Sequence, residues 1–113
     1  MHDKNYTEYC LFSFISFFIM NTYQIFLGLN RPDNETITTE QFNAYTSEVL
    51  DTMFDGYTIS DAVGNWKGQR EATKVVSVCT EYKNLVNKAA ELYKVYFEQD
   101  AVAINTLPAL EMV

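Results

Sequence analysis

The chain has 113 residues, of which 48% are apolar and 15% aromatic, and its 15 acidic and 8 basic residues give a formal net charge of −7. This length predicts a single domain, and the apolar content excludes a disordered chain. The acidic balance argues against a nucleic-acid partner, because binding to a phosphate backbone needs clustered lysine and arginine.

The scarcity of histidine and cysteine restricts the chemistry further. His2 is the only histidine, which argues against a Ser-His-Asp triad, a Cys-His pair and a histidine-rich zinc site. Cys10 and Cys79 are the only cysteines and lack metal-binding spacing. They favour a reducing cytoplasm, with Cys79 buried as a small apolar residue. We therefore expect no metal and no cofactor, and a reaction that uses carboxylates, tyrosines, amides or the substrate itself.

An apolar block, residues 9–20 (YCLFSFISFFIM), stands near the start of the chain. It is shorter than the ~20 residues of a membrane-spanning helix and lacks a small-residue cleavage site after it. We interpret residues 1–19 as a dispensable extension and residues 20–113 as the folded domain, with no membrane partner. A secreted or membrane-tethered protein is the alternative.

The first strand is predicted over residues 22–29 (TYQIFLGL), where Tyr23, Ile25 and Leu27 alternate with Gln24 and Phe26. Because successive side chains of a strand point to opposite faces, Phe26 falls on the face opposite the other apolar side chains. The turn residues 30–34 (NRPDN) follow this strand.

The first helix is predicted to begin at Thr38, which forms a capping-box pattern with Gln41 three positions later. Apolar residues then recur at helical spacing, as Phe42, Tyr45, Val49, Met53 and Phe54. Gly56 is the candidate C-cap of this helix.

Two strands, a helix and a last strand follow. Residues 57–63 and 71–80 are predicted to be strands joined by a turn at 64–68 (GNWKG). The second helix is expected over residues 82–97, with a buried stripe of Leu85, Ala89, Leu92, Tyr93 and Tyr96. Residues 101–105 (AVAIN) are apolar on both sides, which predicts a central strand. Residues 107–113 are then an edge extension or a partner contact.

This β-α-β-β-α-β order predicts an α+β fold of the ferredoxin-like type. Four strands form an antiparallel sheet, and both helices cover one face of it. The other face is left to solvent, a ligand or another subunit. Because the first strand carries apolar side chains on both faces, we expect an oligomer.

The predicted hairpin of residues 56–71 brings Tyr57, Trp66 and Glu71 into one neighbourhood. Two aromatic rings and a carboxylate suit a sulfonium or quaternary ammonium ligand, because ring faces and carboxylates both attract a cation. A purely structural interpretation is the alternative: Trp66 covers the core edge, Tyr57 packs on the first helix, and Glu71 pairs with Arg70 or Lys74.

Four stretches between residues 56 and 102 carry a resemblance to a known family. They are Gly56-Tyr57, the Gly64-Asn65-Trp66 turn, residues 71–79 (EATKVVSVC) and residues 98–102 (EQDAV). In this order and with this spacing the sequence resembles the phage-encoded S-adenosylmethionine lyases, formerly called S-adenosylmethionine hydrolases. A family of uncharacterised bacterial proteins shares a similar Gly-x-Trp turn and glutamate-led strand.

The resemblance implies a homotrimer that binds S-adenosylmethionine between subunits and converts it to 5′-methylthioadenosine and L-homoserine lactone. It implies that Glu71 is the active-site glutamate and Tyr57 the active-site tyrosine. Phe26, Trp66 and Gln99 are further candidate substrate contacts. An oligomeric ferredoxin-like module that binds a metabolite or acts as a sensor without catalysis is the alternative.

Overall fold

The structure, a computed structural model, describes residues 20–108, except for the side chain of Trp66. Its elements are β1 (Asn21–Gly28), α2 (Thr39–Tyr45), η1 (Thr46–Leu50), α3 (Asp51–Met53), β2 (Thr58–Trp66), β3 (Gln69–Thr80), α4 (Lys83–Phe97) and β4 (Ala103–Pro108). The proposed extension at residues 1–19 and the tail at residues 109–113 lie outside the described residues.

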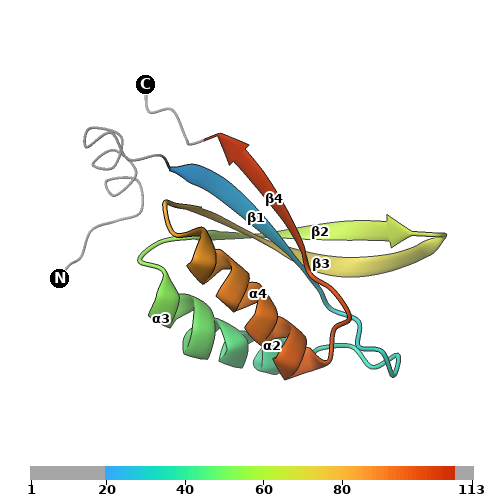
Figure 1. Cartoon of the computed structure of the whole chain (residues 1–113). Coiled ribbons are helices and arrows are strands. Elements are labelled where there is room, and N and C mark those ends of the chain that lie inside the picture. The colour runs from blue at the N-terminus through green and yellow to red at the C-terminus, as the bar shows by residue number, and fades with distance from the viewer. Residues whose placement is uncertain (1–19, 109–113) are drawn as a thin grey trace.

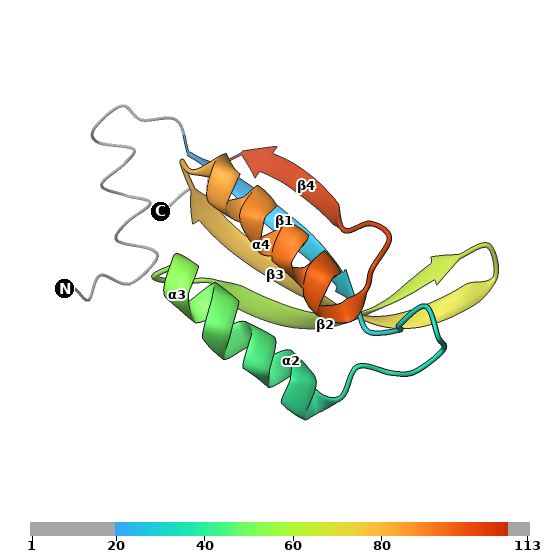
Figure 2. The same cartoon turned by 60° about the horizontal axis from the view of Figure 1, so that its bottom comes forward.

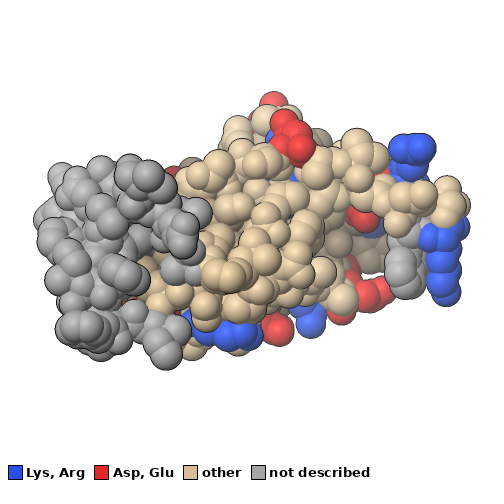
Figure 3. All heavy atoms as spheres, turned by 90° about the horizontal axis from the view of Figure 1, so that it is seen from above, with Lys and Arg blue, Asp and Glu red and all other residues tan. Residues whose placement is uncertain are grey.

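The sheet is antiparallel and has the strand order β2-β3-β1-β4. Figures 1 and 2 show α2 to α3 and α4 lying side by side on one face of this sheet. The predicted ferredoxin-like α+β fold is therefore confirmed. Figure 3 views the molecule from the side away from the helices, where the described surface over the middle of the sheet is almost free of charged side chains.

The first helical segment begins as predicted and ends differently. The Thr38 hydroxyl accepts from the Gln41 backbone N–H at 3.1 Å, and the Gln41 side chain accepts from the Thr38 N–H at 2.9 Å. A π-helical turn over Thr46–Leu50 then rotates the buried face, so that Leu50 joins Val49 in the core. The helix ends at Met53, before Gly56, so the prediction of Gly56 as the C-cap is wrong.

The core lies between β1, β3 and the helices. Tyr23, Ile25 and Leu27 are buried on the predicted inner face of β1. The buried stripe of α4 differs from the predicted one by a rotation of the helix, and consists of Val86, Ala89, Ala90, Tyr93 and Phe97. Because alanine is small, Ala89 and Ala90 let α4 approach the rest of the core closely. The larger Leu85, Leu92 and Tyr96 lie at the margin of this stripe.

The last strand differs from the prediction in both extent and position. Strand β4 runs from Ala103 to Pro108 and pairs only with β1 among the described strands. The central strand predicted at residues 101–105 is therefore an edge strand. Pro108 at its end fits this place, since proline removes a ladder donor and is tolerated at edges.

The hairpin of β2 and β3 is longer than predicted. Strand β2 continues through residues 64–66, and only Lys67 and Gly68 form the turn, both with positive φ (51° and 82°). Two positive φ angles are the mark of a tight type I′ hairpin turn. Because β1 ends at Gly28, opposite Thr73, the hairpin extends beyond the sheet as a two-stranded arm, residues 63–72 (Figure 2).

Two predictions concern Cys79 and the membrane. Cys79 is completely buried, as predicted. Among residues 20–108, no helix has the length and apolar character needed to cross a membrane.

Candidate functional site

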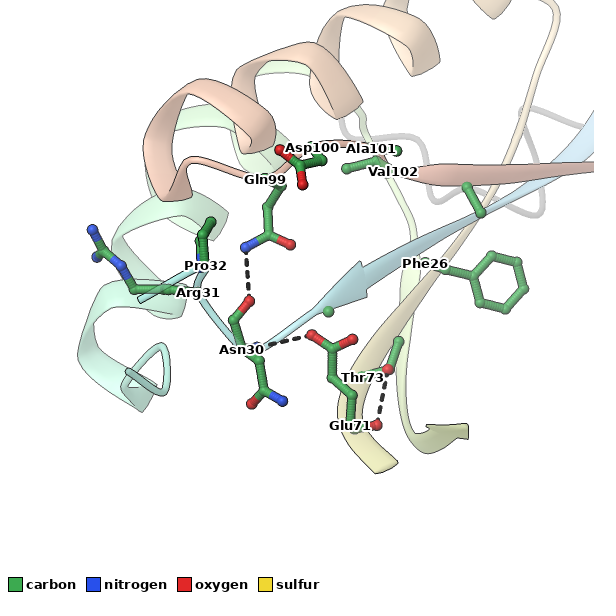
Figure 4. Close-up of a pocket in the computed structure, with 12 residues that line it drawn as sticks. Phe26, Asn30, Arg31, Pro32, Glu71, Thr73, Gln99, Asp100, Ala101 and Val102 are labelled. Atoms are coloured by element: carbon green, nitrogen blue, oxygen red, sulfur yellow. Dashed lines mark hydrogen bonds between the residues drawn. The ribbon is translucent and has the colours of Figure 1, made fainter. Parts of the chain in front are cut away.

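A cavity of about 790 Å³ lies where β1 leaves the sheet and α4 leads into β4. Figure 4 shows its walls, which come from segments far apart in the sequence. The lining residues are Phe26, Gly28, Asn30, Arg31, Pro32, Glu71, Thr73, Gln99, Asp100, Ala101, Val102 and Ala103. Three of the predicted site residues, Phe26, Glu71 and Gln99, are therefore brought together in one chain.

Glu71 reaches this cavity from β3 and is held against the end of β1. Its Oε2 accepts a hydrogen bond of 2.9 Å from the backbone N–H of Asn30 (Figure 4). A Cβ on Gly28 would lie 2.4 Å from the same oxygen, so only glycine leaves room for the carboxylate at this place. The end of β1 thus provides both the space and a donor for Glu71.

The charge of Glu71 is not neutralised within the described part of the chain. Lys74, one of its predicted partners, instead pairs with Asp61 at 2.5 Å. Arg31, which also lines the cavity, pairs with Glu98 at 3.3 Å. No ion pair to Glu71 occurs among residues 20–108. A half-buried carboxylate without a cation favours a cationic ligand.

Gln99 lies on the opposite wall of the cavity from Glu71. Its side-chain Nε2 donates to the carbonyl oxygen of Asn30 at 2.9 Å and to that of Phe97 at 3.2 Å. The chain turns sharply before it, since Glu98 caps α4 in the left-handed conformation with φ of 54°. The backbone of Asn30 therefore links the two walls, because its N–H donates to Glu71 and its carbonyl oxygen accepts from Gln99 (Figure 4).

Phe26 provides an aromatic ring on the sheet face away from the helices. In the sheet it stands between Val75 of β3 and Ala103 of β4. Figure 4 shows its ring on the same side of β1 as Glu71. The cavity thus combines an apolar floor with a carboxylate, an arrangement that can attract a large cation.

Tyr57 does not share this cavity. Thr58, the next residue, pairs with Ser77, whereas Glu71 pairs with Gly64 six positions further along β2 (58 to 64). At ~3.3 Å per residue, Tyr57 and Glu71 are about 20 Å apart. The prediction that one hairpin brings them into one neighbourhood is therefore wrong within a single chain.

The Tyr57 hydroxyl lies at the helix layer instead. It donates to Asp51 Oδ1 at 2.5 Å. Burial, the hydrogen bond to Asp51 and the charge of Asp51 all raise the pKa of Tyr57, so the hydroxyl stays protonated at neutral pH. Trp66 ends β2 opposite Gln69, and its side chain is not part of the described structure.

Sequence reasoning missed the contribution of the segment from Gly28 to Arg31. A glycine inside a strand pattern indicates a close approach by another group, and Gly28 carried that signal. Nothing in the local sequence identifies the backbone N–H of Asn30 as a donor to Glu71, because the contact spans 41 positions. Within residues 20–108, no cluster of His, Cys, Asp and Glu could hold a metal ion.

Comparison with known proteins places the chain in a family. Residues 22–110 match the family described as "Protein of unknown function (DUF3574)". This match covers most of the chain, so the protein belongs to the DUF3574 family. No curated protein matches the sequence.

Two solved structures share the architecture. The chain is similar to a phage SAM lyase in complex with S-methyl-5′-thioadenosine, with 16% identity and a TM-score of 0.62 over 79% of this chain and 81% of the other. It is also similar to CutA1 from Oryza sativa, with 16% identity and a TM-score of 0.52 over 84% of each chain. At these identities the likeness establishes a common fold.

Proposed function

We propose that this member of the DUF3574 family is a lyase that converts S-adenosylmethionine to 5′-methylthioadenosine and L-homoserine lactone. The observation that carries the proposal is Glu71, a carboxylate without a cation that is held in a cavity beside an aromatic ring. S-adenosylmethionine is a sulfonium cation with a planar adenine, so it supplies the charge and the apolar surface that such a cavity can bind. The resemblance in residues 56–102 and the common fold support the same choice.

The proposed reaction is intramolecular and needs no added reactant. A carboxylate oxygen of the substrate attacks the γ-methylene carbon of its own amino-acid chain, which is bonded to sulfur, and a carbon–oxygen bond forms. The carbon–sulfur bond breaks, and its electron pair stays on sulfur as a neutral thioether. The nucleophile is ionised at neutral pH and the leaving group needs no proton, so neither a general base nor a general acid is required. A chain with one histidine is adequately equipped for it.

The protein has two tasks in such a reaction. It must hold the substrate in a curled conformation, which raises the effective molarity of the carboxylate. It must also exclude water. The carboxylate and the sulfonium neutralise each other in the transition state, so water would stabilise the charged substrate more than the transition state. We assign to Glu71 the binding of the amino or sulfonium group, and to Phe26 and Gln99 contacts with the rest of the substrate.

A homotrimer would reconcile the separate positions of the predicted site residues. If Tyr57 contacts the substrate bound at Glu71, it must come from a neighbouring copy, because Tyr57 lies about 20 Å away in the same chain. The middle of the sheet face, with few charged side chains, and the protruding arm 63–72 offer surfaces for such contacts (Figure 3). Isolated two-stranded arms are marginally stable in water, which favours a partner for this one.

Incubation with S-adenosylmethionine tests the proposal. We expect 5′-methylthioadenosine and homoserine lactone in equal amounts, identified by chromatography and mass spectrometry. The absence of turnover by pure, folded protein would contradict the proposed activity. Cell fractionation tests the cytoplasmic location proposed with it: recovery outside the cytoplasm would overturn that location.

A binding module without catalysis is the second candidate function. The structural similarity to CutA1 favours it, because the fold is not confined to a lyase. In that case S-adenosylmethionine or a related nucleoside should raise the melting temperature while the ligand is recovered unchanged. Turnover of the same ligand would exclude this candidate.

A further inference from the structure

Tyr93 of α4 connects the helix layer to the end of β1. Its side chain is completely buried, and its hydroxyl donates a hydrogen bond of 2.6 Å to the carbonyl oxygen of Gly28. Gly28 is the last residue of β1 and lies two positions before Asn30, the donor to Glu71. Tyr93 therefore hydrogen-bonds to the backbone segment that contacts the Glu71 carboxylate.

Gly28 contacts Glu71 closely enough for small movements to matter. The position of a Cβ on Gly28 lies 2.4 Å from Glu71 Oε2. The Asn30 N–H donates to that same oxygen at 2.9 Å. A displacement of Gly28 would thus change both the space that the Glu71 carboxylate occupies and the position of the Asn30 N–H that donates to it.

We propose that Tyr93 is a positioning residue that sets the place of Glu71 through the backbone of residues 28–30. The inference rests on the proposed function, and it adds a residue that lies outside the cavity lining. Burial, together with the charge of Glu71, raises the pKa of the Tyr93 hydroxyl. The hydroxyl therefore remains a donor at neutral pH.

Tyr45 provides a matched control. It is as completely buried as Tyr93, and its hydroxyl also donates to a backbone carbonyl, that of Ala89 at 2.8 Å. The two rings contact each other edge to face, with centroids 5.0 Å apart. The Tyr45 hydrogen bond remains within the helix layer, so its loss should not reach Glu71.

Turnover of S-adenosylmethionine by the full chain tests the proposal. We expect Tyr93→Phe to lower kcat/KM by about tenfold, because small displacements of a positioned group are costly. Tyr45→Phe should leave it within about twofold of wild type. Both variants should lose similar thermal stability, since each loses one buried hydrogen bond. Equal effects of the two substitutions on kcat/KM would overturn the positioning role.

Amide hydrogen exchange gives a test that does not depend on turnover. In Tyr93→Phe the Asn30 amide should exchange about tenfold faster than in wild type, while the Ile25 amide in the middle of β1 should accelerate less than Asn30 and no more than it does in Tyr45→Phe. Tyr45→Phe should not change the exchange rate of the Asn30 amide. Unchanged exchange at Asn30, or equal acceleration at Ile25, would overturn the inference. An effect confined to Asn30 in a protein without turnover would support it while contradicting the proposed function.

A double variant tests whether Tyr93 and Gln99 hold the same backbone segment. Gln99→Leu removes the hydrogen bond to the Asn30 carbonyl from the other wall of the cavity. It should accelerate exchange at Asn30, and the additional loss of Tyr93 in a double variant should have less than the additive effect if both act on one peptide segment. Additive effects would contradict a shared segment.

Discussion

The two candidate catalytic side chains stand near opposite ends of the β2–β3 hairpin and are held in different ways. Glu71 faces a cavity, accepts a single backbone N–H and has no ion-pair partner among the described residues. Tyr57 donates to Asp51 and has no access to that cavity. We therefore propose that the end with Glu71 binds a cationic ligand within a single chain, whereas Tyr57 acts in catalysis only if a second copy brings it to a cavity.

Among the substitutions that test this comparison, Glu71→Gln should lower turnover of S-adenosylmethionine the most. The substitution keeps the size of the side chain and removes its charge, so a charge-assisted contact worth ~1.5–3 kcal/mol is lost. We expect kcat/KM for S-adenosylmethionine to fall by roughly 10- to 100-fold. Glu91→Gln, the same change on the exposed surface of α4, is the control and should leave turnover unchanged. Wild-type rates for Glu71→Gln would remove this carboxylate from the site.

Gly28→Ala should displace Glu71 without changing its chemistry. The new methyl group would lie 2.4 Å from Oε2, so the carboxylate must move. A loss of about tenfold in kcat/KM is expected. Gly64→Ala is the matched control, because its Cβ would lie 3.5 Å from Thr73 Oγ, an ordinary contact. If both alanine variants keep full activity, the close approach at Gly28 has no functional role.

Tyr57→Phe distinguishes a shared site from a local structural role. If a neighbouring copy places Tyr57 at Glu71, turnover should fall several-fold while the free energy of unfolding changes by no more than ~1 kcal/mol. Tyr82→Phe, on an exposed tyrosine, is the control. Turnover equal to wild type would limit Tyr57 to its hydrogen bond with Asp51.

Mass measurement by light scattering should give three copies, and a monomer would exclude the shared site.

The smallest effect expected is a loss of stability at high pH. Burial raises the pKa of Tyr45 and Tyr93, so the folded state keeps these protons more tightly than the unfolded state. Their contribution to stability is complete below about pH 10, where an unfolded tyrosine titrates, and is lost as the pH rises further. Urea unfolding between pH 8 and 12 measures this, and Tyr45→Phe should flatten the decline. An unchanged slope would contradict the assignment to Tyr45.

The fold was largely predictable because its signals are local. Alternation in residues 22–29 and the capping box at Thr38 and Gln41 specify a strand and a helix from neighbouring residues alone. The buried stripe of α4 was not predicted correctly, because close helix packing selects Ala89 and Ala90 over larger residues. The edge place of β4 follows from strand order, which no single segment encodes.

The candidate site was predictable only in part, for the same reason. Glu71, Phe26 and Gln99 were predicted from residue chemistry and resemblance, and the fold brings them to one cavity. The separation of Tyr57 from Glu71 depends on the register and length of the hairpin, in which the strand continues where a turn was expected. The contact of Asn30 with Glu71 exists only after β1 and β3 have paired.

Turnover of S-adenosylmethionine in water labelled with oxygen-18 tests the central claim most directly. If the substrate carboxylate is the nucleophile, freshly formed homoserine lactone contains no label, and 5′-methylthioadenosine appears at the same rate. Labelled homoserine formed directly, or a ligand recovered intact from folded protein, would contradict the account.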